Sequence, residues 1–170
     1  MDAAAKLTAM EGIRHLVLCD ISGETYGIDI ELVDTVIRNQ PVTSVPCMPH
    51  FVEGVVNLRG SIIPVVDLRK RFNLVIKPTQ RDSRIVVVRV KQQWVGLVVD
   101  AVTRTCHLPI DQIEAASSLV VNVKHRYIEG VAQLDEQIII VLNIEQSLSS
   151  EEAADIDEAS EFLQKEGFEQ

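Results

Sequence analysis

The segment from Phe51 to Leu68 recurs later in the same chain, and this repeat is the strongest constraint on the fold. It has the sequence FVEGVVNLRGSIIPVVDL, and the segment from Tyr127 to Ile144 has the sequence YIEGVAQLDEQIIIVLNI. The two align without a gap and share seven of eighteen residues, among them the triplet Glu-Gly-Val. Two copies are too few for a solenoid, which needs at least three stacked units, so the repeat predicts two small β-barrels.

A strand-turn-strand pattern precedes each copy, which extends the repeated unit to a hairpin, a connector and a second hairpin. Its apolar runs are bounded by short polar turns, as expected for hairpins, and they cover residues 14–21, 25–30, 84–90 and 94–100. The polar stretch 77–83 separates the two halves. We therefore expect a flexible N-terminus over 1–13, one domain over 14–148 with intertwined subdomains of about 14–76 and 84–148, and a tail over 149–170.

Charge is distributed unevenly along the 170 residues, whose formal net charge is -9. Residues 149–170 hold eight acids and one lysine, so this tail carries -7 and the rest of the chain about -2. The tail begins with a capping-box pattern followed by apolar residues at helical spacing, which predicts an acidic helix. A nearly neutral body lacks the clustered Lys and Arg that nucleic-acid binding requires, so we expect no nucleic-acid partner.

The chain has three cysteines and no C-x-x-C pair, which argues against a disulfide framework and favours a reducing compartment. The N-terminal residues contain no apolar signal-peptide core, and no apolar run approaches the roughly 20 residues of a membrane-spanning helix. We therefore expect a cytoplasmic protein that does not insert into a membrane. Catalytic and phosphate-binding motifs are missing from the sequence, so no enzyme activity or cofactor is expected.

Two sets of residues suggest binding chemistry but leave alternatives open. Cys47, His50, Cys106 and His107 offer ligands for tetrahedral zinc, although separate loops holding a buried Cys and a surface His explain the pattern better. Residues 67–73 predict a short helix with Asp67 as N-cap. The following bases Arg69, Lys70 and Arg71 either complement the helix end or form a basic binding patch.

The two copies differ most in the turn between their strands. Asn57-Leu58-Arg59-Gly60 in the first copy is replaced by Gln133-Leu134-Asp135-Glu136 in the second, and Pro64 is replaced by Ile140. The turn therefore does not require an arginine. Arg59 either extends into solvent or pairs with a carboxylate of a partner or a neighbouring loop. Pro64 cannot donate to a strand ladder, which predicts an edge strand or a bulge there.

Four ordered motifs resemble the CheW family of bacterial chemotaxis coupling proteins. They are TYGIDI at 25–30, FVEGVVNLRGSIIPVVDL at 51–68, WVGLVVDAV at 94–102 and YIEGVAQLDEQIIIVLNIEQSL at 127–148. The resemblance covers about residues 14–148, and Asn-Leu-Arg-Gly followed by a strand and Val-Asp-Leu-Arg is its most specific part. It implies a mainly β fold of two interlocked five-stranded SH3-like barrels, with short helices and a C-terminal helix.

The resemblance also implies a function and a site. Family members are non-enzymatic adaptors that link the cytoplasmic tip of a methyl-accepting chemoreceptor to the regulatory domain of the histidine kinase CheA, within membrane-associated arrays. A helical receptor tip in an apolar groove is an ordinary mode of recognition. The implied groove consists of Ile30, Val33, Arg59 and Val102, with Gly54, Asn57 and Gly60 shaping the adjoining surface. From residue type alone, Val33 and Val102 are core residues by default.

One position departs from the family pattern. Members often carry a glutamate spaced to pair with the arginine of the Asn-Leu-Arg-Gly turn, and this chain has Thr35 there. Asp34 or Glu31 could replace it, but a one-residue shift on a strand turns a side chain to the other face. This departure keeps a second hypothesis open, an auxiliary scaffold of a different chemosensory pathway. A small metal- or ligand-binding β-barrel is the third.

Overall fold

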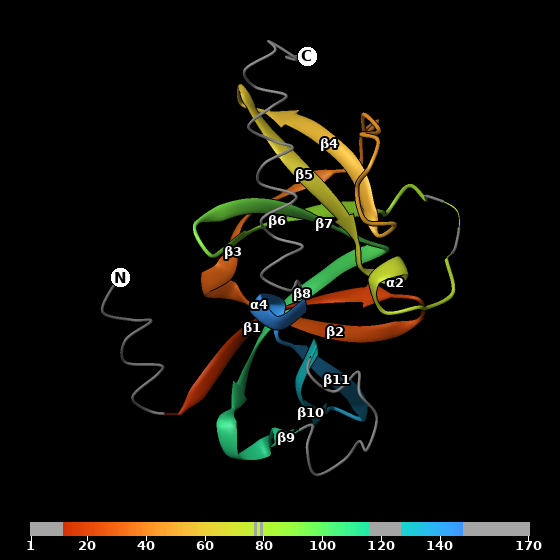
Figure 1. Ribbon diagram of the computed structural model, residues 1–170. Coiled ribbons are helices and arrows are strands. Elements are labelled where there is room, and N and C mark those ends of the chain that lie inside the picture. The colour runs from red at the N-terminus through yellow and green to blue at the C-terminus, as the bar shows by residue number, and fades with distance from the viewer. Residues whose placement is uncertain (1–11, 77, 79, 116–126, 148–170) are drawn as a thin grey trace.

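The computed structural model describes residues 12–76, 78, 80–115 and 127–147, which form two β-sheets and a few short helices (Figure 1). The predicted acidic tail and most of the predicted flexible N-terminus lie outside these residues. The elements are β1 (Ile13–Ile21), β2 (Glu24–Asp29), η1 (Ile30–Leu32), β3 (Val33–Arg38), β4 (Val52–Leu58), β5 (Ser61–Asp67), α2 (Leu68–Arg71), β6 (Arg84–Val90), β7 (Gln93–Val99), β8 (Ala101–Pro109), η2 (Ile110–Gln112), β9 (Glu114–Ala115), β10 (Ile128–Leu134), β11 (Gln137–Leu142) and α4 (Ile144–Ser147).

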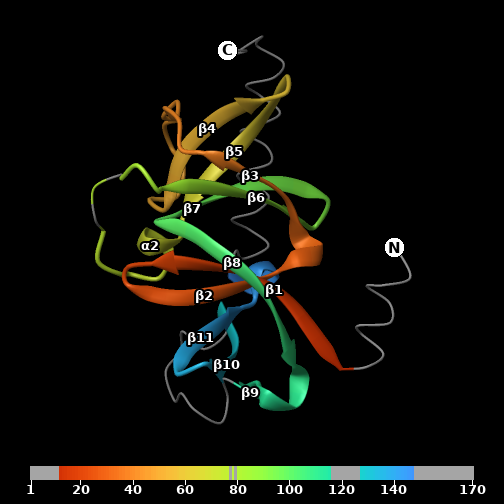
Figure 2. The ribbon, with the colours of Figure 1, turned by 180° about the vertical axis from the view of Figure 1, so that it is seen from behind.

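Each sheet takes strands from both halves of the chain. The six-stranded sheet has the order β8-β1-β2-β11-β10-β9, and the five-stranded sheet has the order β3-β6-β7-β5-β4. The β1–β2 hairpin thus joins strands of the second half, and the β6–β7 hairpin joins strands of the first. The view from behind shows the two sheets one above the other (Figure 2). The prediction of a mainly β fold is confirmed, with six and five strands in place of five and five.

The two sheets repeat each other in hydrogen-bond register. In the parallel pairs, Val65 lies opposite Gly96 in one sheet, and Val141 lies opposite Gly27 in the other. The sequence repeat aligns Val65 with Val141, so equivalent residues occupy equivalent places. The bulges repeat as well, since one follows the first residue of β4 and another follows the first residue of β10. The two halves are therefore related by an internal pseudo-twofold axis. A residue in β1–β3 has its equivalent 69 residues later in β6–β8, as Gly27 has in Gly96.

Both faces of the central strands are buried, which explains why their sequences do not alternate between apolar and polar residues. In β6, Ile85 and Val87 point into a cluster within the five-stranded sheet, whereas Val86 and Val88 point into a cluster shared with the other sheet. The six-stranded sheet has its own equivalent cluster around Leu16 and Leu18. Among the described residues the core thus has three large clusters and a small fourth one at Val55 and Ile62, and the shared cluster holds the two sheets together.

The glycine of each Glu-Gly-Val triplet allows a neighbouring backbone to approach closely. At Gly54, φ is +145°, and a Cβ atom would lie 2.0 Å from the carbonyl oxygen of Thr43. Thr43 and Val55 exchange backbone hydrogen bonds of 2.8 and 2.9 Å at this point. Gly130 has the same role, because its Cβ atom would lie 2.5 Å from the carbonyl oxygen of Glu114 in β9. A packing requirement therefore accounts for both glycines without a binding partner.

A buried ion-pair network lies at the end of β5. The guanidinium group of Arg69 donates to both carboxylate oxygens of Asp67, at 3.0 and 2.9 Å, and to Asp100 at 3.1 Å. Asp67 also caps α2, as predicted, by accepting from the backbone N–H of Arg69 at 2.9 Å. Donation of hydrogen bonds to the Asp67 carboxylate raises the pKa of Arg69 above its ordinary value. Asp100 accepts from the N–H of Ser22 as well, so the network ties together segments from both sheets.

The other two bases of this helix also have partners inside the protein. Lys70 forms an ion pair with Glu53 at 2.5 Å. The guanidinium carbon of Arg71 lies 4.8 Å from the ring centre of Phe51 and 4.6 Å from that of Tyr127, the first residues of the two repeat copies. Cation–π contacts of this kind help to hold the copies against each other. The interpretation of residues 69–71 as a basic binding patch is therefore wrong for Arg69, which is buried.

Candidate functional site

Val33 and Val102 occupy equivalent places beside the core that the two sheets share. Val33 begins β3 and lies opposite Val88, while Val102 follows the first residue of β8 and lies opposite Cys19. Both valines are partly buried and pack against the same shared cluster. Two of the four predicted groove residues thus pack against the same cluster, and each is both a boundary residue of the core and part of the surface.

Ile30 lies three residues before Val33, in the single turn η1. The turn is held by the carboxylate of Asp29, which accepts from the N–H of Glu31 at 3.0 Å. Ile30 is half-buried, and Glu31 is exposed. In β3, exposure alternates along the strand, so that Asp34 is exposed and Thr35 is half-buried. Ile30 therefore lies next to Val33 on the path from η1 into β3, and Asp34 and Thr35 face opposite ways.

Arg59 occupies the tip of the β4–β5 hairpin, apart from the other three residues. Arg59 and Gly60 have φ of +54° and +85°, which makes a two-residue turn with both residues in the left-handed region. The side chain of Asn57 accepts from the N–H of Gly60 at 3.0 Å and stabilises this turn. A left-handed arginine costs roughly 1 kcal/mol. The same turn is built from Asp135 and Glu136 in the second copy, so the backbone does not select an arginine.

The side chain of Arg59 is exposed and forms no ion pair with any residue that the structure describes. This includes Glu31 and Asp34, so their pairing with Arg59 stays a prediction. Gly60, beside it, has open space where a Cβ atom would lie. The hairpin tip therefore presents a charged guanidinium group that the fold itself does not use.

The four residues of the metal hypothesis do not meet. Cys47 is exposed on the loop before β4, whereas Cys106 is buried in β8 opposite Leu16. His107 instead stacks on His15 across the sheet edge, with ring centres 4.0 Å apart. Within the described ranges, no group of three or more His, Cys, Asp or Glu side chains is placed to hold a metal ion. The helices of these ranges are also all too short or too polar to cross a membrane.

We predict that one of the three thiols reacts with Ellman's reagent in the native protein at pH 8. Cys47 is exposed, while Cys19 and Cys106 are buried. Burial raises the pKa of Cys19 to about 12, with the charges of Asp20 and Asp100 adding to the effect, so its reactive thiolate is scarce. The Cys47→Ser variant should lose the fast reaction, and all three wild-type thiols should react in guanidinium chloride. Two fast thiols in the native state would contradict this placement.

The sequence analysis missed the network of Arg69, Asp67 and Asp100, although a signal was present. The triplet Val-Val-Asp ends β5, at 65–67, and recurs at 98–100, where its aspartate directly follows the last residue of β7. Two parallel neighbours that end in the same acid place two carboxylates at one edge of a sheet, where a buried cation is needed to compensate them. Arg69 supplies that cation.

Comparison with known proteins agrees with this architecture. Residues 15–152 match the model of the CheW-like domain. The chain is 35% identical to the chemotaxis protein CheW of Klebsiella aerogenes over 144 residues, covering 85% of this chain and 87% of that protein. It is 31% identical to that of Treponema pallidum, covering 81% and 84%. The crystal structure of the scaffolding protein TtCheW from Thermoanaerobacter tengcongensis superposes with a TM-score of 0.75 at 34% identity, covering 82% and 94%.

Two sheets that share one core are the architecture of a CheW-type scaffold or adaptor protein, as the matched domain and the superposed structure show. The chain belongs to the CheW-like domain family, whose members are chemotaxis scaffolds and not enzymes. This confirms the family that the four motifs predicted. It also makes the metal- or ligand-binding barrel unnecessary as an explanation of Cys47, His50, Cys106 and His107.

Proposed function

We propose that this protein couples the cytoplasmic tip of a methyl-accepting chemoreceptor to the regulatory domain of the histidine kinase CheA, in cytoplasmic arrays beneath the receptors. Ile30, Val33 and Val102 supply an apolar surface for the helical receptor tip. Arg59 supplies a charged contact at the hairpin tip, with Asn57 and Gly60 holding its turn. Coupling of this kind uses many moderate contacts, because an array multiplies their effect.

One observation supports this proposal most directly: a half-buried valine stands in the equivalent place of each half, against the shared core. A surface that is apolar, partly buried and continuous with the core suits helix-in-groove recognition. Arg59 adds a second argument, since the turn tolerates it at a cost and the fold gives it no ion pair among the described residues. Arginine is among the residues that most often dominate binding energy at interfaces.

We predict that Arg59→Ala lowers affinity for a receptor signalling-tip fragment by about tenfold or more, which corresponds to about 1.4 kcal/mol. Receptor-dependent autophosphorylation of the kinase should fall with it. The matched control is Asp135→Ala, which makes the same truncation at the equivalent turn position of the other copy. Both variants should unfold within about 0.5 kcal/mol of the wild type. Equal binding by the two variants would remove Arg59 from the interface.

A second candidate is an auxiliary scaffold of a different chemosensory pathway. The chain is 26% identical to the protein PilI of Pseudomonas aeruginosa over 108 residues, covering 64% of this chain and 61% of that protein. Thr35 stands where a glutamate is frequent in the family. Binding assays against several receptor types distinguish the candidates, because the auxiliary scaffold would bind none of the receptors that activate the kinase. Thr35→Glu should then restore affinity if this position determines the choice of partner.

A further inference from the structure

The internal repeat places a different set of side chains where the first half has its buried ion-pair network. The backbone N–H of Asp67 donates to the carbonyl of Phe51 at 2.8 Å, and the N–H of Asn143 donates to Tyr127 in the same way at 2.9 Å. Asn143 is therefore the equivalent of Asp67, and Glu145, two residues later, is the equivalent of Arg69.

The third member of the network follows from the parallel ladders. Asp100 lies four residues after Gly96, and Glu31 lies four residues after Gly27, the equivalent glycine. Beside the five-stranded sheet an arginine lies between two aspartates, whereas the equivalent place beside the six-stranded sheet has an asparagine and two glutamates. The arginine that closes the first network has no counterpart at the equivalent position, and the carboxylate of Asp100 is retained as Glu31.

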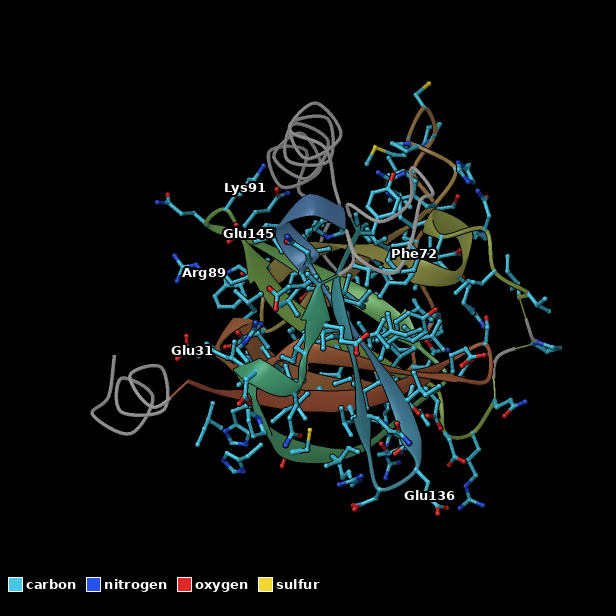
Figure 3. All side chains as sticks on the ribbon, turned by 90° about the horizontal axis from the view of Figure 1, so that it is seen from below. Glu31, Phe72, Arg89, Lys91, Glu136 and Glu145 are labelled. Carbon is cyan, nitrogen blue, oxygen red and sulfur yellow. The ribbon has the colours of Figure 1, made fainter. Side chains whose placement is uncertain are left out.

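The equivalent place beside the six-stranded sheet is an open groove of about 310 Å³. Four carboxylates line it, together with one arginine, one asparagine and the apolar residues Leu32, Leu142 and Ile144. The arginine, Arg14, already forms ion pairs with Asp29 and Glu129. The side chains of Glu31 and Glu145, labelled in Figure 3, are exposed. Neither has an ion-pair partner among the residues that the structure describes. The groove therefore has two carboxylates available for a cation.

We propose that this groove receives an arginine side chain of the bound partner, whose guanidinium group takes the place that Arg69 fills in the first half. The inference rests on the proposed function, because η1 connects the groove directly to Ile30 and Val33. The independent observation is the first-half network itself, where the equivalent position holds a guanidinium at 2.9 and 3.1 Å from two carboxylates.

The chemistry of the groove favours arginine over other cations. The planar guanidinium fork matches carboxylates at more than one point, and it is more weakly hydrated than an ammonium group. Leu32, a half-buried residue that lines the groove, offers apolar contact to the three methylene groups of the arginine stem. Within the described residues, no group of three or more His, Cys, Asp or Glu side chains is placed to hold a metal ion. The groove is therefore less suited to a divalent metal ion than to a guanidinium group. The partner is thus expected to present an arginine beside the apolar residues that dock on Val33.

The first experiment supplies the arginine within the same chain. Glu145→Arg places a guanidinium where Arg69 stands in the other copy, so it should occupy the groove and raise the unfolding midpoint. It should also weaken binding of the receptor signalling-tip fragment at least tenfold, whereas the control Glu136→Arg makes the same charge change on the β10–β11 turn and should bind like the wild type. Equal affinity of Glu145→Arg and the wild type overturns the assignment.

The second experiment tests the groove without a receptor. N-acetyl-arginine amide is titrated into labelled protein and compared with its citrulline analogue, which has the same shape without the charge. Amide shifts around Glu31 and Glu145 are expected with the arginine compound only, and they should be lost in Glu145→Arg. Identical shifts with both compounds, or none, overturn the inference. If the tip fragment fails to bind the wild type, the proposed function fails and this titration still decides whether the groove takes a guanidinium.

Discussion

Replacing Arg69 with methionine is expected to lower the free energy of unfolding by about 3–5 kcal/mol, because the change leaves a buried carboxylate without its cation. The side chains of Arg69 and Asp67 are 6% and 3% exposed, so water cannot take over the lost hydrogen bonds. Asp100 loses its ion pair as well, although it still accepts from the N–H of Ser22. Urea unfolding followed by circular dichroism measures the change directly.

The neighbouring residue provides the control. Lys70 pairs with Glu53, and their side chains are 33% and 32% exposed. Lys70→Met should therefore cost less than about 1 kcal/mol, as is usual for solvated ion pairs. Combining Arg69→Met with Asp67→Asn removes the buried charge together with its partner and should recover part of the loss. An Arg69→Met protein as stable as Lys70→Met would show that the network contributes little to folding.

The sequence predicts the local elements of this protein well and their assembly less well. The hairpins at 14–30 and 84–100 follow from apolar runs bounded by polar turns, and the structure has them within one residue. The repeat predicts equivalent places for Gly54 and Gly130, which the close backbone approaches confirm. These features depend on neighbours in the chain, where the type of each residue limits the backbone it can adopt.

The assembly depends on pairings between strands far apart in sequence, for which local patterns carry little information. Pro64 illustrates this limit. Pro64 predicts an edge strand or a bulge, yet β5 lies inside the five-stranded sheet between β7 and β4, so the edge prediction is wrong. The register shift of the β4–β5 pair falls between Val52 and Gly54 of the facing strand and not at Pro64. The pairing of β5 with β7 begins only at Val65, so Pro64 stands just before the parallel ladder and no hydrogen bond is lost.

In the candidate site too, local features could be predicted from the sequence, whereas features that depend on strand pairing could not. Val33 and Val102 could be assigned to a core by residue type, but their equivalence appears only when β3 and β8 pair with β6 and β1. The resemblance to the family gave their predicted role in binding, and that role stays a proposal. The sequence analysis interpreted Arg69 either as a charge that complements the helix end or as part of a basic binding patch. Both interpretations place it at the surface, because a basic residue is rarely buried unless it is paired. Its partner Asp100 is thirty-one residues away, beyond any local pattern.

Gly54→Ala is expected to destabilise the protein by more than about 4 kcal/mol or to prevent folding, an effect that few single substitutions reach. The added Cβ atom would lie 2.0 Å from the carbonyl oxygen of Thr43 and 2.7 Å from its carbonyl carbon, and backbone atoms cannot rotate away as a side chain can. The φ of +145° is itself unfavourable for alanine. For a chain of this size, the melting temperature should fall by at least about 8 °C.

Two other glycines separate the clash from the general cost of removing a glycine. Gly130→Ala, at the equivalent position, should be nearly as severe, since its Cβ atom would lie 2.5 Å from the carbonyl oxygen of Glu114. Gly60→Ala meets open space at a φ of +85°, so it should cost only about 1–2 kcal/mol. Melting curves of the three variants therefore rank Gly54 and Gly130 far below Gly60. If all three variants had the same melting temperature, the close backbone approach would not be the reason that the Glu-Gly-Val triplets need a glycine.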